Sequence, residues 1–110
     1  MPSEEIAAIG YLTAKEGRQD DCYQLAKSLT DSTRSKDQGC LYYAVFSRAN
    51  DPREFVIHER WQNLAALRAH LGRLVAEYGP PAPGAPPGSL PAKIAEAFDK
   101  IQFIGLKIVE

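Results

Sequence analysis

The sequence predicts one α+β domain, in which a single four-stranded antiparallel sheet carries helices on one face. Two segments space their apolar residues with the helical period, and four shorter segments are rich in apolar, β-branched or aromatic residues. These segments follow one another in the order β-α-β-β-α-β, with an additional short helix before the last strand. With 110 residues, the chain is long enough to bury a core as one domain over residues 1–110.

The N-terminal part predicts a strand followed by a helix. Residues 5–14 are mostly apolar and stop before a polar, glycine-containing segment, which is typical of a strand. From Asp20 onward the apolar residues follow helical spacing, so we expect a helix over residues 20–35. Acidic residues begin this segment and basic residues end it, as the helix dipole favours. Gly39 follows the helix and ends it.

A β-hairpin is expected next, with strands at residues 41–47 and 55–61 and a turn at Asn50-Asp51-Pro52. The first strand contains the unbroken apolar run LYYAVF, in which Tyr43 shares parity with Leu41 and Val45. An unbroken apolar strand indicates burial on both faces. Because the helices of one chain cover only one face, we expect the other face to pack against a second copy in a homodimer.

A second long helix is expected after Asn63, which suits the N-cap position. Its apolar stripe runs from Leu64 to Tyr78, and Gly79 with the prolines after it ends the helix. His70 lies about 90° from the centre of that stripe, at the border between core and solvent.

The C-terminal part combines a proline-rich loop, a short helix and the last strand. Residues 80–91 hold six of the eight prolines and predict an extended surface loop, either a spacer or a lid over a pocket. A short helix is expected from Pro91 through Asp99, and the last strand at residues 101–109. This order of elements is the split βαβ, ferredoxin-like arrangement.

The composition argues against several classes of partner. Thirteen basic and fourteen acidic residues give a net charge of −1 without a basic cluster, which disfavours nucleic-acid binding. No apolar run approaches the roughly 20 residues of a membrane span, and the acidic N-terminus is unlike a signal peptide, so we expect a cytoplasmic protein without a membrane partner. The two cysteines and two histidines form no metal-binding motif, and no glycine-rich nucleotide motif occurs, so we expect neither a metal nor a cofactor.

Residues 39–71 carry features typical of a known family. They are Gly39-Cys40 entering a strand with Tyr43, Asp51-Pro52 in the turn, Phe55 and Glu59-Arg60-Trp61 on the next strand, and Leu67 with Ala69-His70-Leu71 on the helix. In these features the chain resembles the antibiotic biosynthesis monooxygenase family of dimeric α/β-barrel proteins. The resemblance implies a cofactor-independent oxidoreductase that uses O₂ to oxidise a small phenolic or quinol substrate. Haem-degrading proteins of this fold use an Asn on the first strand and a Trp and a later His on the central helix. This sequence has none of these, so haem degradation is disfavoured.

The resemblance also implies roles for particular residues. His70 would be the acid/base, Trp61 and Tyr43 the pocket walls, and Asn63 and Arg34 polar groups that orient the substrate, while Glu59 is a further candidate for substrate binding. Proton transfer from a phenol of pKa about 10 to a His of about 6.5 is uphill by roughly 5 kcal/mol. Asn63, Arg34 and Arg60 are therefore candidates for stabilising the phenolate.

Each candidate also has a purely structural alternative. His70 could bond a backbone carbonyl or Glu59, Trp61 could be a core anchor, and Asn63 only a helix cap. Glu59, which shares a face with Trp61, could instead form an ion pair or hydrogen bond to a helix. His58 alternates to the opposite face, where it would be a surface or interface residue.

The alternative to an enzyme is a non-catalytic dimeric α/β-barrel protein that binds a small aromatic metabolite or acts in a stress response. The two share all core residues, so the sequence alone does not separate them. A cleft beside His70 that is open and lined by polar groups would favour the enzyme.

Overall fold

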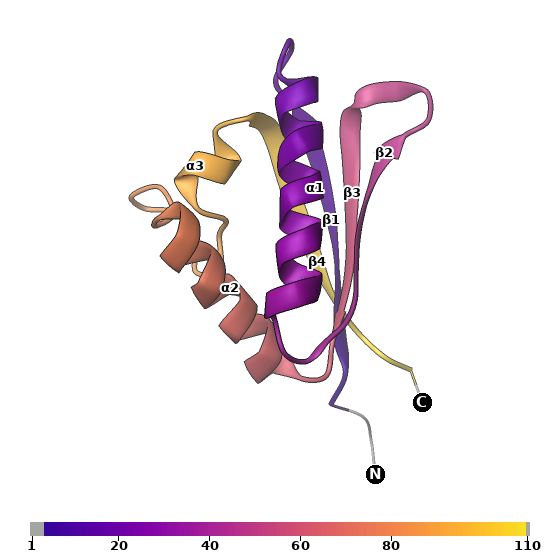
Figure 1. Cartoon of the computed structure of the whole chain (residues 1–110), viewed down its shortest axis with the longest axis vertical. Helices are drawn as coiled ribbons and strands as arrows, with labels where there is room; N and C mark the ends of the chain where they lie inside the picture. Colours follow the sequence, from indigo (N-terminus) through magenta and orange to yellow (C-terminus); the bar gives the residue numbers. More distant parts are fainter. Residues whose placement is uncertain (1–3, 110) are drawn as a thin grey trace.

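The computed structural model describes residues 4–109, and its elements follow the predicted order (Figure 1). The elements are β1 (Ile6–Ala14), α1 (Gln19–Lys36), β2 (Cys40–Arg48), β3 (Asp51–Trp61), α2 (Leu64–Tyr78), α3 (Ala92–Ala95) and β4 (Phe98–Lys107). The four strands form one antiparallel sheet in the order β2-β3-β1-β4. The predicted α+β, ferredoxin-like fold is confirmed.

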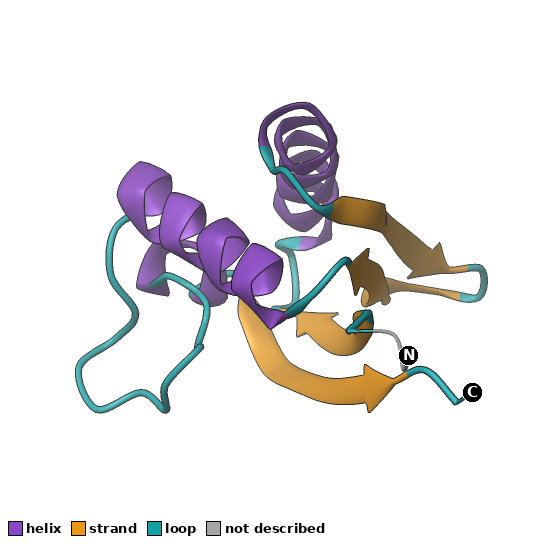
Figure 2. Cartoon of the chain, turned by 90° about the horizontal axis from the view of Figure 1, so that it is seen from below, coloured by secondary structure: helices purple, strands orange, loops and turns teal. Residues whose placement is uncertain are grey.

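Both long helices lie on the same side of the sheet, as Figure 2 shows from below. The side chains that point toward the helices include the buried residues Leu12, Phe55, Ile57 and Trp61, which form one core cluster. A second cluster, made of Leu29, Leu74 and Ile94, joins the helices to one another. Among residues 4–109, no helix is both long enough and apolar enough to cross a bilayer.

The strand register aligns one residue from each strand into rows that cross the sheet. On the helix-facing side, one row contains Tyr43, Glu59, Ala8 and Gly105. The neighbouring row contains Val45, Ile57, Gly10 and Phe103. Both rows carry large side chains on β2 and β3 and small residues on β1.

Gly10 has a specific packing role in the second row. A Cβ atom added there would lie 2.5 Å from an atom of the Phe103 ring, far closer than side chains normally approach. The glycine therefore allows the aromatic ring of β4 to lie across β1, which is how aromatic residues cover glycines in sheets.

The hairpin differs from the prediction in its turn and in the pairing of its strands, which shifts register near Leu41 and again between Ser47 and Arg48. The two strands are joined through Ala49 and Asn50 alone, so the expected turn residues Asp51 and Pro52 already belong to β3. Pairing passes from Cys40–Trp61 to Tyr42–Arg60, which leaves Leu41 as an extra residue in a β-bulge. Leu41 is 49% exposed. The expectation that it shares a face with Tyr43 is therefore wrong.

The predicted capping of α2 is confirmed, but the predicted buried side of the helix is not. The Asn63 side-chain oxygen accepts a hydrogen bond from the Ala66 amide at 2.9 Å, and Gly79 ends the helix with φ 94°. Leu64, an expected core residue, is 47% exposed, whereas His70 is only 2% exposed. The expected border position of His70 is wrong. The end of α1 lies beside α2, and the buried carboxylate of Asp37 there contacts the imidazole of His70.

The proline-rich loop contains two consecutive tight turns. Each has the order X-Pro-Gly-X, and its glycine has a positive φ, 82° at Gly84 and 81° at Gly88. Hydrogen bonds from Ala85 to Ala82 and from Ser89 to Pro86 close the turns at 3.0 and 3.2 Å. This is the type II β-turn, in which proline favours the first central position and glycine the second.

The short helix and the last strand also differ from the prediction in their bounds. The helix α3 ends at Ala95, and β4 already begins at Phe98. The predicted helix through Asp99 is therefore wrong, because Phe98 extends the sheet and packs edge-on against Phe55, with ring centroids 6.4 Å apart.

Candidate functional site

A cavity of about 220 Å³ lies between the sheet and the helices. Its floor includes the small residues Ala8 and Gly105, and its walls are mostly apolar side chains from both long helices. Gly88 and Leu90 of the proline-rich loop also line it. The cavity exists because β1 and β4 place small residues where a packed core would have large ones.

Glu59 contributes a carboxylate to this apolar cavity, and it is only 5% exposed. The Trp61 indole Nε1–H donates a hydrogen bond to Glu59 Oε1 at 2.8 Å, and no second partner for this carboxylate is found within residues 4–109. The expectation that Glu59 pairs with a group on a helix is wrong, because its partner Trp61 lies on the same strand, β3. Burial raises the pKa of Glu59 to about 6, although the indole hydrogen bond opposes this shift.

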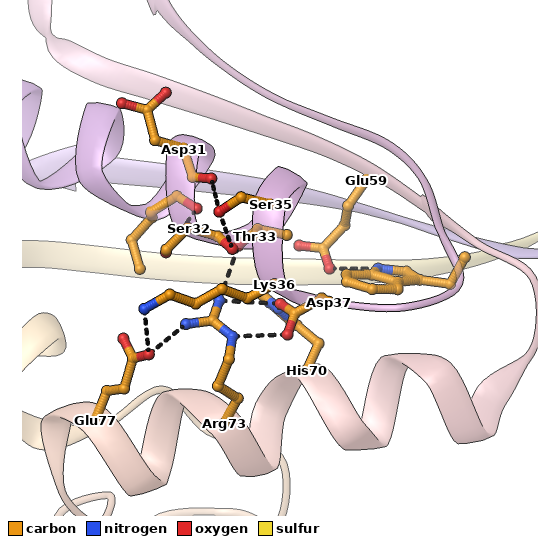
Figure 3. A network of polar contacts seen from close by, with 12 residues as sticks. Asp31, Ser32, Thr33, Ser35, Lys36, Asp37, Glu59, His70, Arg73 and Glu77 are labelled. Carbon is orange, nitrogen blue, oxygen red and sulfur yellow. Dashed lines mark hydrogen bonds and ion pairs between the residues drawn. The ribbon is translucent and has the colours of Figure 1, made fainter.

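His70 reaches the same cavity from α2 and is oriented by Asp37 (Figure 3). His70 Nδ1 lies 2.6 Å from Asp37 Oδ2, and Arg73 donates two hydrogen bonds to the same carboxylate at 2.6 and 2.9 Å. Burial alone would raise the pKa of Asp37, but the hydrogen bonds from Arg73 and His70 lower it overall, so Asp37 is ionised at neutral pH.

An ionised Asp37 fixes the protonation of the imidazole. The carboxylate only accepts hydrogen bonds, so Nδ1 of His70 carries the proton and Nε2 keeps its lone pair. Burial lowers the pKa of His70, although Asp37 opposes this shift, so the ring is neutral at neutral pH. Within the described part of the chain, Nε2 has no hydrogen-bond partner. His70 can therefore accept a proton at Nε2.

Two aromatic rings flank the imidazole. The Trp61 ring centroid lies 4.7 Å from that of His70, and the Tyr43 centroid lies 5.7 Å away. Tyr43 is 3% exposed and lines the cavity, and burial raises the pKa of its phenol far above the usual value. Its hydroxyl therefore stays protonated and can donate a hydrogen bond.

The sequence prediction missed Asp37 and Arg73, because Asp37 lies between the predicted helix over residues 20–35 and Gly39, where no role was expected. A usable signal was present, since Arg73 and His70 are three residues apart and share one face of α2. The network continues through Glu77, which contacts Arg73 Nη1 and Lys36 Nζ, each at 3.1 Å. Asp37 thus ties the end of α1 to the middle of α2.

The structure brings four of the candidate residues together and places the other three, Asn63, Arg34 and Arg60, elsewhere. Tyr43, Glu59 and His70 line the cavity. Trp61 is fully buried, donates a hydrogen bond to Glu59 and packs its ring against that of His70. Asn63 caps α2, and Arg34 donates from Nε to the Tyr43 carbonyl at 2.9 Å. Neither Asn63 nor Arg34 lines the cavity.

The fold and the partly open apolar cavity define the class of protein: a ferredoxin-like α+β domain with a site between the sheet and the helices. Residues 5–75 match the family described as antibiotic biosynthesis monooxygenase, which is more than half of the chain. The chain belongs to this family. Membership supports a general monooxygenase-like function.

Several solved structures share the fold. A protein from Pseudomonas aeruginosa is 21% identical with a TM-score of 0.75, and the match covers 100% of this chain and 99% of that one. A protein from Bacteroides thetaiotaomicron, described as a possible oxidoreductase, is 21% identical with a TM-score of 0.74, covering 96% and 99%. A protein described as an antibiotic biosynthesis monooxygenase is 23% identical with a TM-score of 0.71, covering 96% and 99%. No protein of curated function matches the sequence significantly.

Asp37→Asn tests whether Asp37 sets the tautomer of His70. The amide can present its NH₂ group to Nδ1, so the imidazole proton should move to Nε2, and ¹⁵N NMR should show the two ring nitrogens exchanging character. The matched control is Glu77→Gln, which removes a carboxylate from the same network without touching His70. Unchanged His70 nitrogen shifts in Asp37→Asn would contradict this assignment.

Proposed function

We propose that the protein is a cofactor-independent monooxygenase that oxidises a small phenolic or quinol substrate with O₂ inside this cavity. The observation that carries the proposal is the pair of buried proton acceptors, Glu59 and His70, on the wall of a mostly apolar cavity. A base in such a place can ionise a phenol where little water competes. We assign the activity to the cytoplasm, where free thiols such as Cys22 and Cys40 persist.

The reaction uses the substrate itself as the source of electrons. A base removes the hydroxyl proton, and the resulting electron-rich phenolate can pass electrons to O₂. One oxygen atom forms a new bond to a ring carbon, and the other leaves as water with two substrate hydrogens. The balance is RH₂ + O₂ → RO + H₂O, which requires no external reductant.

The proton transfer is the step that the site must assist. A phenol of pKa about 10 facing Glu59 of pKa about 6 leaves roughly 5 kcal/mol uphill. Asn63, Arg34 and Arg60, the expected stabilisers, do not line the cavity. The Tyr43 hydroxyl is the donor that does line it, so we assign it to the developing phenolate. His70 Nε2 is then available for the second proton of a quinol.

We also propose that two chains pack their open sheet faces together in a homodimer, as the family resemblance implies. The face turned away from the helices carries large apolar side chains that are 40–51% exposed. They are Tyr11, Tyr42, Phe46, Ile104 and Leu106. Contiguous apolar surface of this kind marks an interface, and a second copy supplies a matching one.

A binding protein without catalysis is the second candidate. It is favoured by the mostly apolar lining of the cavity, since a cleft lined by polar groups was expected of an enzyme. It is also favoured by Arg34 and Asn63, whose contacts are to the backbone and lie outside the cavity. Such a protein would hold the same aromatic ligand without consuming O₂.

His70→Ala tests the catalytic proposal. Loss of a general base lowers kcat by about 100-fold or more, so O₂ uptake with a panel of quinols should fall by that amount. His58→Ala is the matched control, since His58 lies on the opposite face of the sheet beside Tyr42. Equal O₂ uptake by wild type and His70→Ala would contradict the role of His70. Quinol binding without O₂ uptake by the wild type would support the binding protein.

Light scattering tests the homodimer. The expected mass is twice 12.1 kDa at micromolar concentration. Phe46→Asp should shift the protein toward the monomer, because it puts a charge in the proposed interface. Tyr23→Asp should not, although Tyr23 on α1 and Phe46 are both 51% exposed. A folded wild-type monomer at micromolar concentration would overturn this proposal.

A further inference from the structure

We propose that the cavity selects an uncharged, single-ring compound bearing a hydroxyl group, and that it excludes anions and fused three-ring compounds. This inference rests on the proposed function, because it names the substrate class of the same site. It follows from the charges that line the cavity, from its volume and from the placement of its polar groups.

The first argument concerns charge. Within residues 4–109, no lysine or arginine lines the cavity. The nearby cations are engaged elsewhere: Arg34 with a backbone carbonyl, Arg60 with Glu5, and Arg73 with Asp37 and Glu77. A carboxylate or phosphate inside would lose its hydration without gaining a counter-ion. It would also face the carboxylate of Glu59, so binding of anions is opposed twice.

The second argument concerns size. A cavity of about 150 Å³ holds one benzene ring, whereas pockets for drug-sized ligands begin at about 300 Å³. The volume of about 220 Å³ therefore suits one ring with small substituents. Phe103 limits the cavity on the β4 side, where its ring lies across Gly10, and Leu90 limits it on the side of the loop.

The third argument concerns orientation. The row Tyr43–Glu59–Ala8–Gly105 crosses the floor with polar groups at one end and small residues at the other. A ring lying over Ala8 and Gly105 would turn its hydroxyl toward Glu59 and Tyr43. The carboxylate would accept the hydroxyl proton in a hydrogen bond, and the Tyr43 hydroxyl could donate to the same oxygen.

The test for charge compares 4-hydroxybenzamide with 4-hydroxybenzoate, which have similar size and differ by one charge. Anaerobic calorimetry at about pH 7.5, where Glu59 is ionised, measures binding without oxidation. We expect the amide to bind about tenfold or more tightly than the carboxylate. In Glu59→Gln, the ratio of the affinities for the amide and the carboxylate should fall, because the charge of Glu59 is removed. Equal or tighter binding of the carboxylate to the wild type would overturn the proposal, and so would no binding of either compound.

The test for size adds 1,8-dihydroxyanthrone, a neutral three-ring phenol, which should not bind. Gly105→Leu should weaken binding of the amide about tenfold, because a side chain there enters open space at the cavity. Gly72→Leu, on the exposed side of α2, is the matched control. Ala8→Val provides a second filled floor if Gly105→Leu does not fold. Binding of the anthrone, or amide affinity unchanged in the folded floor variant, would contradict the proposal.

Oxygen uptake separates this inference from the proposed function. If the protein prefers the amide but consumes no O₂ with any quinol, the proposed ligand selection stands and the proposed oxidation is contradicted. If the protein oxidises 4-hydroxybenzoate faster than the amide, the proposed oxidation stands and the proposed ligand selection is contradicted.

Discussion

The carboxylate of Glu59 is held in an apolar layer by one hydrogen bond, and the site depends on this arrangement. Burial raises its pKa from 4.5 to about 6, so the folded protein binds more protons than the unfolded chain between these values. The stability that this carboxyl group contributes is present below pH 4.5 and is lost as pH rises through about 6. Ionised Glu59 therefore costs roughly 2 kcal/mol at neutral pH. A structural role alone would be met by an uncharged residue, which is why we assign this group to ligand chemistry.

Different strands and helices supply different parts of the site. The β2–β3 hairpin supplies Tyr43, Glu59 and the supporting Trp61, whereas β1 and β4 supply the empty space through Ala8 and Gly105. The helices add His70 and hold it in one tautomer through Asp37. Asp37 lies at the junction of α1 with the next strand, so the packing of the two helices also sets the direction of the imidazole.

Much of this structure follows from local sequence, because helical and strand periods are local properties. The cap at Asn63, the end at Gly79 and the order of elements are all local features, and the structure confirms them. The sequence predicted a pocket beside His70 but not its floor, because Ala8 and Gly105 become neighbours only through the strand register. The signal was visible in part, since Ala8 and Gly10 share parity with Leu12 on the first strand.

The candidate residues divide in the same way. The family features selected Glu59, Trp61 and His70, which the structure does bring together. They could not reveal that Arg34 bonds the backbone or that Asp37 pairs with His70 and Arg73, because those contacts depend on how the helices pack. The bulge at Leu41 is likewise a property of pairing between strands rather than of strand sequence.

The central claim is that a carboxylate with a raised pKa faces the cavity. The most direct measurement is the ¹³C NMR titration of the Glu59 side-chain carboxyl, assigned by loss of its signal in Glu59→Gln. We predict a midpoint at about pH 6. A midpoint at or below pH 4.5 would show a solvated or ion-paired carboxylate and would contradict the account.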